Sequence, residues 1–279
     1  MRVTVLASGS AGNAVLCEGG RGGRTKLLVD CGLPARELAK RFARSATGAR
    51  LEDLRGVLCT HEHGDHAGGV PALASAGMAT YATEGTARAL GLAGTHGVEA
   101  GTSIGIDGVM VLVVAMPHDA AEPVGFILDD GDGRVGVITD CGHADPRVAD
   151  AFASCDILVL EANHDPDLLR AGAYPPALKR RIASPVGHLS NSEAAELLRL
   201  MGPPCAQVII LAHLSAENNQ PRLARTLIDQ TLVSLGVRAR ILVAAQERPT
   251  PPVVSERHRV RILPGMDDRQ LRLAFPDPP

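Results

Sequence analysis

The chain has 279 residues, 45% of them hydrophobic, and a formal net charge of −3, which is the composition of an ordinary globular protein of one large or two small domains. This near-neutral charge excludes a globally basic nucleic-acid binder, so any nucleic acid must meet a local basic patch. An aromatic content of 2%, with no Trp, argues against binding single strands mainly by base stacking.

Short apolar runs rich in β-branched residues alternate with helical patterns along the chain. The first run, residues 1–8, predicts a strand and not a signal peptide, because it is short and lacks a cleavage pattern. Strands are expected at 2–7, 13–17, 25–30, 56–60, 110–115, 124–129, 134–139, 156–160, 207–212 and 239–244. Helices are expected at 34–44, 67–76, 84–90, 146–153, 191–201 and 221–235. Strands followed by helices throughout indicate an α/β class.

A short sequence similarity between the two halves of the chain suggests how these elements are organised. Residues 27–32 read LLVDCG and residues 137–142 read VITDCG, so an apolar strand ends in Asp-Cys-Gly in each half of the chain. This predicts an αββα sandwich built of two related halves. We expect residues 1–246 to form this domain and 247–279 to form a Pro- and Arg-rich extension, with an extended linker at 249–256 and a short strand at 258–263.

Cysteine usage and hydropathy bear on location. Six cysteines stand singly, none in a CxxC pair, and they predict reduced core thiols in a cytoplasmic protein. No apolar run approaches the roughly 20 residues that span a bilayer, so no membrane partner is expected.

The highest density of potential metal ligands lies at residues 61–66, which read HEHGDH directly after an apolar strand. Histidine supplies neutral nitrogen ligands for Zn, Mn or Fe, and aspartate supplies a hard oxygen. His61 and His63 alternate on an extended stretch and can face one side, while Asp65 and His66 follow on a turn that Gly64 permits. The competing interpretation is a polar surface loop, which the density of the motif disfavours.

HEHGDH resembles the signature of the metallo-β-lactamase superfamily, and further landmarks follow in order: Asp30 in LLVD, His118 in MPHDA, Asp140 in VITD and His213 in LAHLS. The resemblance covers roughly residues 1–246. It implies two divalent ions, Zn or Mn, that activate a water molecule. It also implies the ligands: His61, His63 and His118 for one ion, Asp65, His66 and His213 for the other, with Asp140 bridging and Asp30 supporting the loop from beneath.

Longer sequence segments resemble one family of the superfamily, the YycJ or WalJ family. They are LASGSAGN at 6–13, HDAAEPVGF at 118–126, LEANHD at 160–165, GHLSNSEAAELL at 187–198 and LAHLSAENN at 211–219. This resemblance implies a cytoplasmic bacterial phosphodiesterase, a metal-dependent 5′→3′ exonuclease on double-stranded DNA. It also implies links to mismatch repair and to the neighbourhood of a cell-wall two-component system.

The phrase GHLS favours a phosphodiester substrate, because it resembles the arrangement in RNase J and RNase Z, where a corresponding histidine contacts the scissile phosphate. We therefore expect His188 to be catalytic together with Asp65, by binding phosphate or protonating the leaving group. A helix-capping role is the alternative for His188. Other candidate substrate or supporting residues are Ser10, Asn13, Asn163 and His164.

Basic clusters are the candidates for DNA contact, since phosphate neutralisation needs several cations. The main candidate is Lys179-Arg180-Arg181; others are Lys40-Arg41 with Arg44, and Arg257 with Arg259 and Arg261. Each cluster alone is more typical of a solvated surface.

Three other functions compete with the nuclease. A small-molecule hydrolase of the same fold, such as a thioesterase, lactonase or cyclic phosphodiesterase, is the main alternative, because fold does not imply function. A flavodiiron-type redox protein is disfavoured by His63, where that branch has Glu. A metal-stabilised binding module without turnover is disfavoured by the complete ligand set.

Overall fold

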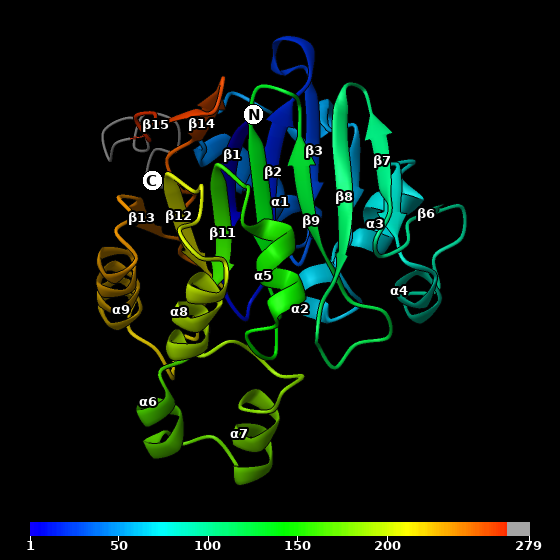
Figure 1. Cartoon of the computed structure of the whole chain (residues 1–279). Helices are drawn as coiled ribbons and strands as arrows, with labels where there is room; N and C mark the ends of the chain where they lie inside the picture. Colours follow the sequence, from blue (N-terminus) through cyan, green and yellow to red (C-terminus); the bar gives the residue numbers. More distant parts are fainter. Residues whose placement is uncertain (267–279) are drawn as a thin grey trace, which may run out of the picture.

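Two β-sheets lie face to face between layers of helices in the computed structural model, which describes residues 1–266 (Figure 1). The first sheet has, in spatial order, β15 (Arg259–Ile262), β14 (Val253–Glu256), β1 (Arg2–Ala7), β2 (Ala14–Gly19), β3 (Thr25–Val29), β4 (Gly56–Leu58), β5 (Thr80–Ala82) and β6 (His96–Gly97). The second has β13 (Arg240–Val243), β12 (Val208–Ala212), β11 (Ile157–Glu161), β10 (Arg134–Ile138), β9 (Val124–Asp129), β8 (Val109–Ala115) and β7 (Ser103–Ile106). The expected αββα sandwich is confirmed.

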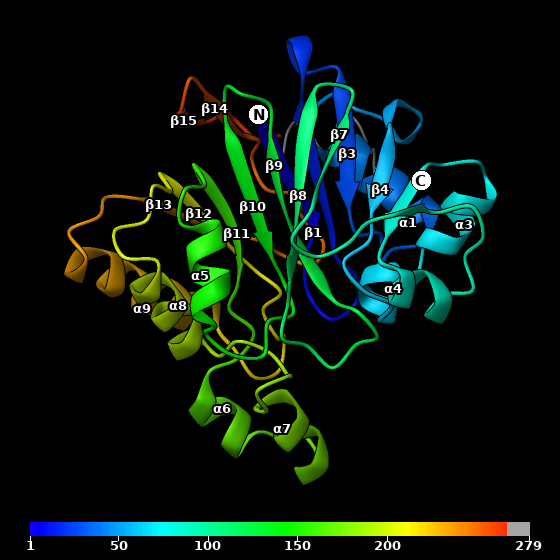
Figure 2. The ribbon, with the colours of Figure 1, turned by 45° about the vertical axis from the view of Figure 1, so that its right-hand side comes forward.

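The helices divide between the two outer surfaces. The first sheet is covered by α1 (Ala35–Arg44), α2 (Gly64–Ala67), α3 (Val70–Ser75) and α4 (Glu84–Ala89), with short 3₁₀ turns at Arg21–Gly23 and Leu51–Asp53. The second is covered by α5 (Pro146–Phe152), α8 (Asn191–Leu200) and α9 (Pro221–Ser234). Two further helices, α6 (Pro166–Ala171) and α7 (Pro176–Ile182), stand away from both sheets (Figures 1 and 2).

Alternating side chains build three apolar layers, because successive residues of a strand point to opposite faces. Val29 and Val137 are buried between the sheets, while their neighbours Leu28 and Ile138 are buried under the outer helices. Strands buried on both faces appear in the sequence as nearly continuous apolar runs. The sequence predicts several such strands, including β1, β2, β3 and β11.

Functional candidates gather where parallel strands end. β3 pairs with β4, and β10, β11 and β12 pair successively, all in parallel, so their carboxyl ends lie together within each sheet. Asp30 and His213 directly follow β3 and β12, and Asp140 stands two residues after the end of β10; their φ angles are 61°, 54° and 55°. Non-glycine residues seldom adopt this left-handed conformation, which turns the chain sharply at each strand end.

Several elements depart from the sequence-based expectations. The helix expected at 67–76 is found as α3, over Val70–Ser75, while α2 covers the preceding residues Gly64–Ala67; between them lies Gly69, where a Cβ atom would lie 2.2 Å from the carbonyl oxygen of Leu33. The short strands β5, β6 and β7 and the helices α6 and α7 were not expected. The expectation that all cysteines lie in the core is wrong for one: all six are free, but Cys205 is exposed.

The C-terminal part of the described chain completes the first sheet. The linker expected at 249–256 is wrong over β14, which pairs antiparallel with β1, and β15 confirms the strand expected at 258–263. The β14–β15 hairpin also touches the second sheet: Ser255 Oγ donates to Asp156 Oδ2 at 3.0 Å, and His258 Nδ1 lies 3.0 Å from the same oxygen. The domain boundary after residue 246 stays a prediction, and residues 267–279 of the expected extension lie outside the described residues.

Across residues 1–266, no helix has both the length and the apolar character needed to cross a membrane.

Candidate metal centre

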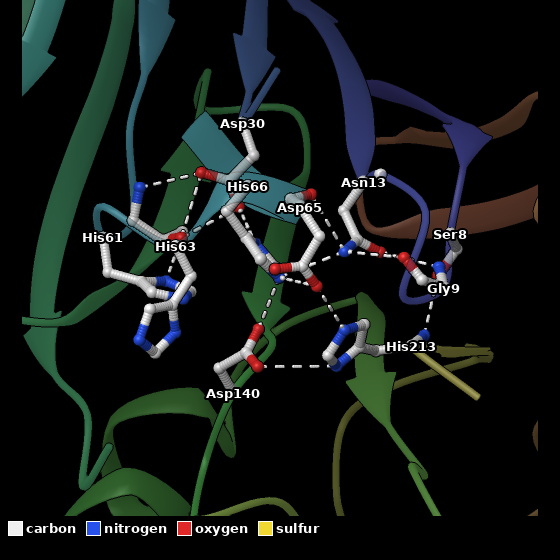
Figure 3. A network of polar contacts seen from close by, with 12 residues as sticks. Ser8, Gly9, Asn13, Asp30, His61, His63, Asp65, His66, Asp140 and His213 are labelled. Atoms are coloured by element: carbon white, nitrogen blue, oxygen red, sulfur yellow. Dashed lines mark hydrogen bonds and ion pairs between the residues drawn. The ribbon is translucent and has the colours of Figure 1, made fainter. Parts of the chain in front are cut away.

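The loop between β4 and α2 places the HEHGDH side chains at one edge of the sandwich, where Asp140 and His213 meet them from the second sheet (Figure 3). His61 and His66 are 1% and 0% exposed, so both imidazole rings are buried inside the protein. The structure therefore brings the sequence-predicted ligands of both halves to one place.

One group of three histidines surrounds a possible ion position. Ring nitrogens of His61, His63 and His118 all lie within 4.8 Å of one another, and His63 Nδ1 is 3.1 Å from His118 Nε2. His118 Nδ1 donates to the Gly187 carbonyl at 2.8 Å, and His61 Nδ1 lies 2.9 Å from Thr60 Oγ1, so each ring is held at the nitrogen that faces away.

A second group consists of Asp65, His66 and His213. Asp65 Oδ2 lies 3.2 Å from His213 Nε2 and 3.6 Å from His66 Nε2. The opposite ring nitrogens are again held: His66 Nδ1 is 2.7 Å from Asp30 Oδ2, and His213 Nδ1 is 2.9 Å from Glu161 Oε1. Outer carboxylates of this kind fix the orientation of metal-binding imidazoles.

Asp140 lies between the two groups. Its Oδ2 is 2.7 Å from His66 Nε2, and its Oδ1 is 3.7 Å from His118 Nε2 and 3.5 Å from His213 Nδ1. His61 Nε2 is buried and lacks a hydrogen-bond partner within the described part of the chain. Buried polar atoms are almost always satisfied, so this nitrogen fits ligation of a divalent cation.

Electrostatics favour a cation at the same point. Burial, reinforced by neighbouring imidazoles, holds the pKa of His61 well below its ordinary value, and burial also lowers that of His118, so both rings are in the neutral form that binds metals. Burial alone would also lower the pKa of His66, but the carboxylates of Asp140 and Asp30 outweigh it and raise that pKa. The carboxylates around His66 therefore favour positive charge at this point, as they would favour a bound cation.

Asp30 supports the metal loop and does not join the ligand groups. Its carboxylate accepts hydrogen bonds from Thr60 N at 2.8 Å and Thr60 Oγ1 at 2.9 Å, in addition to its contact with His66. Asn13 supports the loop from another side, because its Nδ2 lies 3.0 Å from His66 Nε2 and 3.3 Å from the Asp65 carbonyl. Ser10 is exposed and lines the cavity beside the centre.

Glu161, the last residue of β11, is a functional candidate that the sequence analysis missed. Its side chain is fully buried and accepts hydrogen bonds from Cys141 N at 2.8 Å and Leu189 N at 3.3 Å. Its Oε1 lies 2.9 Å from Nδ1 of both His188 and His213, so one carboxylate orients two imidazoles. An acid at the end of an apolar strand, as in Asp30 and Asp140, was the signal that could have identified it.

His188 stands at the border between the metal groups and solvent, with its side chain 14% exposed. Its Nδ1 lies 3.0 Å from Asp140 Oδ1 as well as 2.9 Å from Glu161. Burial opposes the charged form, but these two carboxylates outweigh it and raise the pKa of His188 to about 10. This residue lines a cavity of about 400 Å³ together with Asp65, Asp140 and His213.

The remaining candidates divide between the cavity and other parts of the molecule. Asn163 lines the cavity and donates to the His213 carbonyl at 3.0 Å, whereas His164 is 2% exposed and does not contribute to the lining. Of the basic cluster, Arg181 lines the cavity, while Lys179 donates to the Arg170 carbonyl and Arg180 is exposed.

The other basic clusters lie elsewhere. Lys40 pairs with Glu37, and Arg41 is buried and donates to the Glu247 carbonyl. Arg257 and Arg259 line a separate cavity with residues of β1 and β2. The structure therefore does not gather the three clusters into one basic surface.

Residues 25–214 match the model of the beta-lactamase superfamily domain. Exodeoxyribonuclease WalJ of Streptococcus pneumoniae (serotype 2, strain D39) is 35% identical over 265 residues, 90% of this chain and 96% of that protein. Exodeoxyribonuclease YycJ of Bacillus anthracis is 34% identical over 244 residues, 85% of this chain and 90% of that protein.

Two solved structures share the fold at low sequence identity. The metallo-beta-lactamase fold protein YhfI from Bacillus subtilis has a TM-score of 0.65 at 16% identity, covering 89% of this chain and 98% of that one. Zn²⁺-bound PqqB from Methylobacterium extorquens also has a TM-score of 0.65 at 16% identity, covering 89% and 99%.

Proposed function

The chain belongs to the beta-lactamase superfamily and, within it, to the family of the exodeoxyribonucleases WalJ and YycJ, and from this premise we propose that it is a metal-dependent exonuclease acting on DNA. The proposal extends to 5′→3′ degradation of duplex DNA by a cytoplasmic enzyme of DNA repair. The observation that carries it is His188, a charged imidazole held by two carboxylates beside the ligand groups.

We assign the two ligand groups to two divalent ions, Zn or Mn. His61, His63 and His118 would hold one ion and Asp65, His66 and His213 the other, and Asp140, which lies between the two groups, would serve both. Divalent ions bound there lower the pKa of water and neutralise charge on the phosphate.

The protein's own side chains handle water and protons. Burial opposes the charged form of Asp65, but the hydrogen bond from His213 and nearby imidazoles lower its pKa to about 2, so this carboxylate stays ionised and accepts a hydrogen bond from the attacking water. As the water oxygen bonds to phosphorus, its proton passes to solvent and the phosphorus–oxygen bond to the leaving nucleoside breaks.

His188 serves the leaving side of the reaction. Its Nδ1–H is occupied by Glu161 and Asp140, which leaves Nε2–H to protonate the departing oxygen or to bind a phosphate oxygen. Glu161 acts through His188 and His213 as a positioning residue.

A nuclease assay tests the proposal. Substrates are 5′-labelled duplex DNA, single-stranded DNA and RNA, each with Mn, Zn or EDTA. We expect His63→Ala to lose metal and activity, because an ion loses a ligand. His188→Ala should keep its metal content and lose roughly 10²–10⁴-fold in rate, as a general acid does. His96→Ala, which replaces an exposed histidine of β6, is the matched control and should leave both unchanged.

The outcomes separate the competing functions. The absence of metal-dependent cleavage of every nucleic acid contradicts the exonuclease proposal, and cleavage that survives His63→Ala points to a contaminant. A small-molecule hydrolase is the second candidate, favoured by the modest cavity of about 400 Å³. Turnover of thioesters, lactones or cyclic nucleotides without DNA cleavage supports that candidate instead.

A further inference from the structure

The two helices α6 and α7 and their connection form a helical arm, residues 166–182, inserted between β11 and α8. The arm stands beyond the ends of the strands that carry the metal groups (Figures 1 and 2). Four of its residues line the cavity that also contains His188 and Asp65: Tyr174, Leu178, Arg181 and Ile182. The helical arm therefore forms one wall of the cavity, opposite the metal loop.

This wall is fixed to the loops that carry catalytic histidines. At its start, Asp165 N donates to the Asn218 carbonyl at 2.9 Å, and a Cβ atom at Gly172 would lie 2.5 Å from Asn218 Oδ1. At its end, His188 N donates to the Ile182 carbonyl at 3.0 Å. Because both ends are anchored close to the site, side chains on the arm have defined positions relative to the ligand groups.

Tyr174 is the aromatic residue of this wall. It is half-buried and precedes Pro175 and Pro176, whose rings restrict the backbone on its carboxyl side. Within residues 1–266 its hydroxyl has no hydrogen-bond partner, and its side chain belongs to none of the three apolar clusters. A side chain that supports no core and lines a cavity is available to a ligand, and aromatic rings stabilise nucleic-acid complexes by stacking on bases.

Arg181 adds a charge to the same wall. Its Nε and Nη2 donate to the two carboxylate oxygens of Asp119 at 2.6 and 2.9 Å, and Asp119 follows the ligand candidate His118. This bidentate pair holds the guanidinium in place, while 44% of the side chain remains exposed. An aromatic face and a guanidinium on one wall match the base and the phosphate of a nucleotide.

We propose that Tyr174 is a specificity-determining residue, which stacks on the base of the strand's terminal nucleotide while Arg181 contacts a phosphate. This inference rests on the proposed exonuclease function. A cavity of about 400 Å³ lies near the lower end of the ~300–1,000 Å³ range of small-molecule sites, so it suits one nucleotide. The terminal nucleotide therefore leaves its base pair before cleavage, as bases do in enzymes that act on extruded nucleotides.

The test compares Tyr174→Ala with the wild type on two duplexes, identical except that one has an abasic terminal nucleotide. On the normal duplex, we expect Tyr174→Ala to lower kcat/KM on the order of 10-fold, and Tyr174→Phe to retain it, because the ring is what stacks. On the abasic duplex, wild type and Tyr174→Ala should be equal. Arg181→Gln should slow both duplexes alike, since both keep the phosphate.

Tyr81→Ala is the matched control, because Tyr81 is the other of the chain's two tyrosines and stacks on His96 in the first sheet, not on the cavity. It should leave the ratio between the duplexes unchanged. An equal loss on both duplexes for Tyr174→Ala assigns a structural role and overturns the inference, while the exonuclease proposal stands. If the wild type cleaves neither duplex, the exonuclease proposal itself fails.

Discussion

The two Asp-Cys-Gly loops, residues 30–32 after β3 and 140–142 after β10, share one local structure. Asp30 and Asp140 have φ of 61° and 55°. Each following cysteine donates its thiol proton to the carbonyl two residues further on, at 3.3 Å in the first loop and 3.1 Å in the second. Each glycine is packed so closely that a Cβ would lie 1.8 Å or 2.3 Å from a backbone oxygen.

What differs is the surroundings of the carboxylate. Asp30 is hydrogen-bonded by Thr60 and lies 2.7 Å from His66 Nδ1, so it orients the ring of this proposed ligand. Asp140 faces imidazole nitrogens of both ligand groups, with His66 Nε2 at 2.7 Å and His118 Nε2 at 3.7 Å. The same turn thus delivers a carboxylate in both halves, and the neighbouring side chains decide whether it supports the metal site or enters it.

Asp140→Asn should have the largest effect. Asparagine tolerates the left-handed backbone, so the loop is kept while the ionised oxygens between the ligand groups are lost. We expect loss of bound metal and a fall in exonuclease rate beyond the ~10–100-fold that outer residues of metal sites typically give. Metal analysis by mass spectrometry together with the exonuclease rate checks this, and a fall of no more than about 100-fold would place Asp140 in the same supporting role as Asp30.

Asp30→Asn should weaken metal binding by about 10–100-fold, because one carboxylate oxygen that accepts from Thr60 or His66 becomes a donor. Competition with a chelator measures the affinity. Asp107→Asn is the control, since Asp107 also has positive φ, of 45°, but its side chain is 64% exposed. Equal affinities in all three proteins contradict the supporting role.

Alanine at the two loop glycines should destabilise the fold by about 1–3 kcal/mol each, as overpacking does. Gly32→Ala presses on the Asp65 backbone and should also weaken metal binding, whereas Gly142→Ala presses on Pro185 and should lower the rate through the segment leading to His188. Urea unfolding and metal titration check both, against Gly105→Ala, which has open space. Indistinguishable metal affinities for the two variants contradict the expectation that only the first loop affects metal binding.

The smallest expected effect concerns the reactivity of the two loop thiols, Cys31 and Cys141. Burial raises the pKa of Cys31 to about 12 and also raises that of Cys141, so both should be inert to a thiol reagent at pH 8. Only the exposed Cys205 should react quickly in the native chain, and all six after denaturation. Faster reaction of either loop cysteine indicates that its loop opens.

Residues at strand ends were predictable from the sequence because a polar residue that follows an apolar run marks where a buried strand ends. Asp30, Asp140 and His213 each follow such a run. Glu161 was missed because it is itself the last residue of β11, and only three-dimensional contacts reveal its two histidine partners. The helical arm was missed because α6 and α7 each bury a single residue, Leu169 and Ile182, so the sequence carries no apolar stripe there; α5, as short as α7, buries three residues and was expected.

The end of the sheet was missed for a different reason. β14 lies between β15 and β1, and the prolines before it argue against such a central strand; they end just ahead of its first residue, Val253, and so remove no hydrogen bond from its pairing. Its pairing with β1 joins Val3 to Val253, and no local pattern predicts a partner so distant.

That pairing sets an order for folding during synthesis. β1 emerges from the ribosome long before β14, the strand that covers its open side, because most of the described chain lies between them. Until then β1 presents an unpaired backbone edge to other chains, which is the usual starting point for aggregation. The β14–β15 hairpin, which also binds Asp156 of the second sheet, is therefore the closing step that joins both sheets and protects the nascent enzyme.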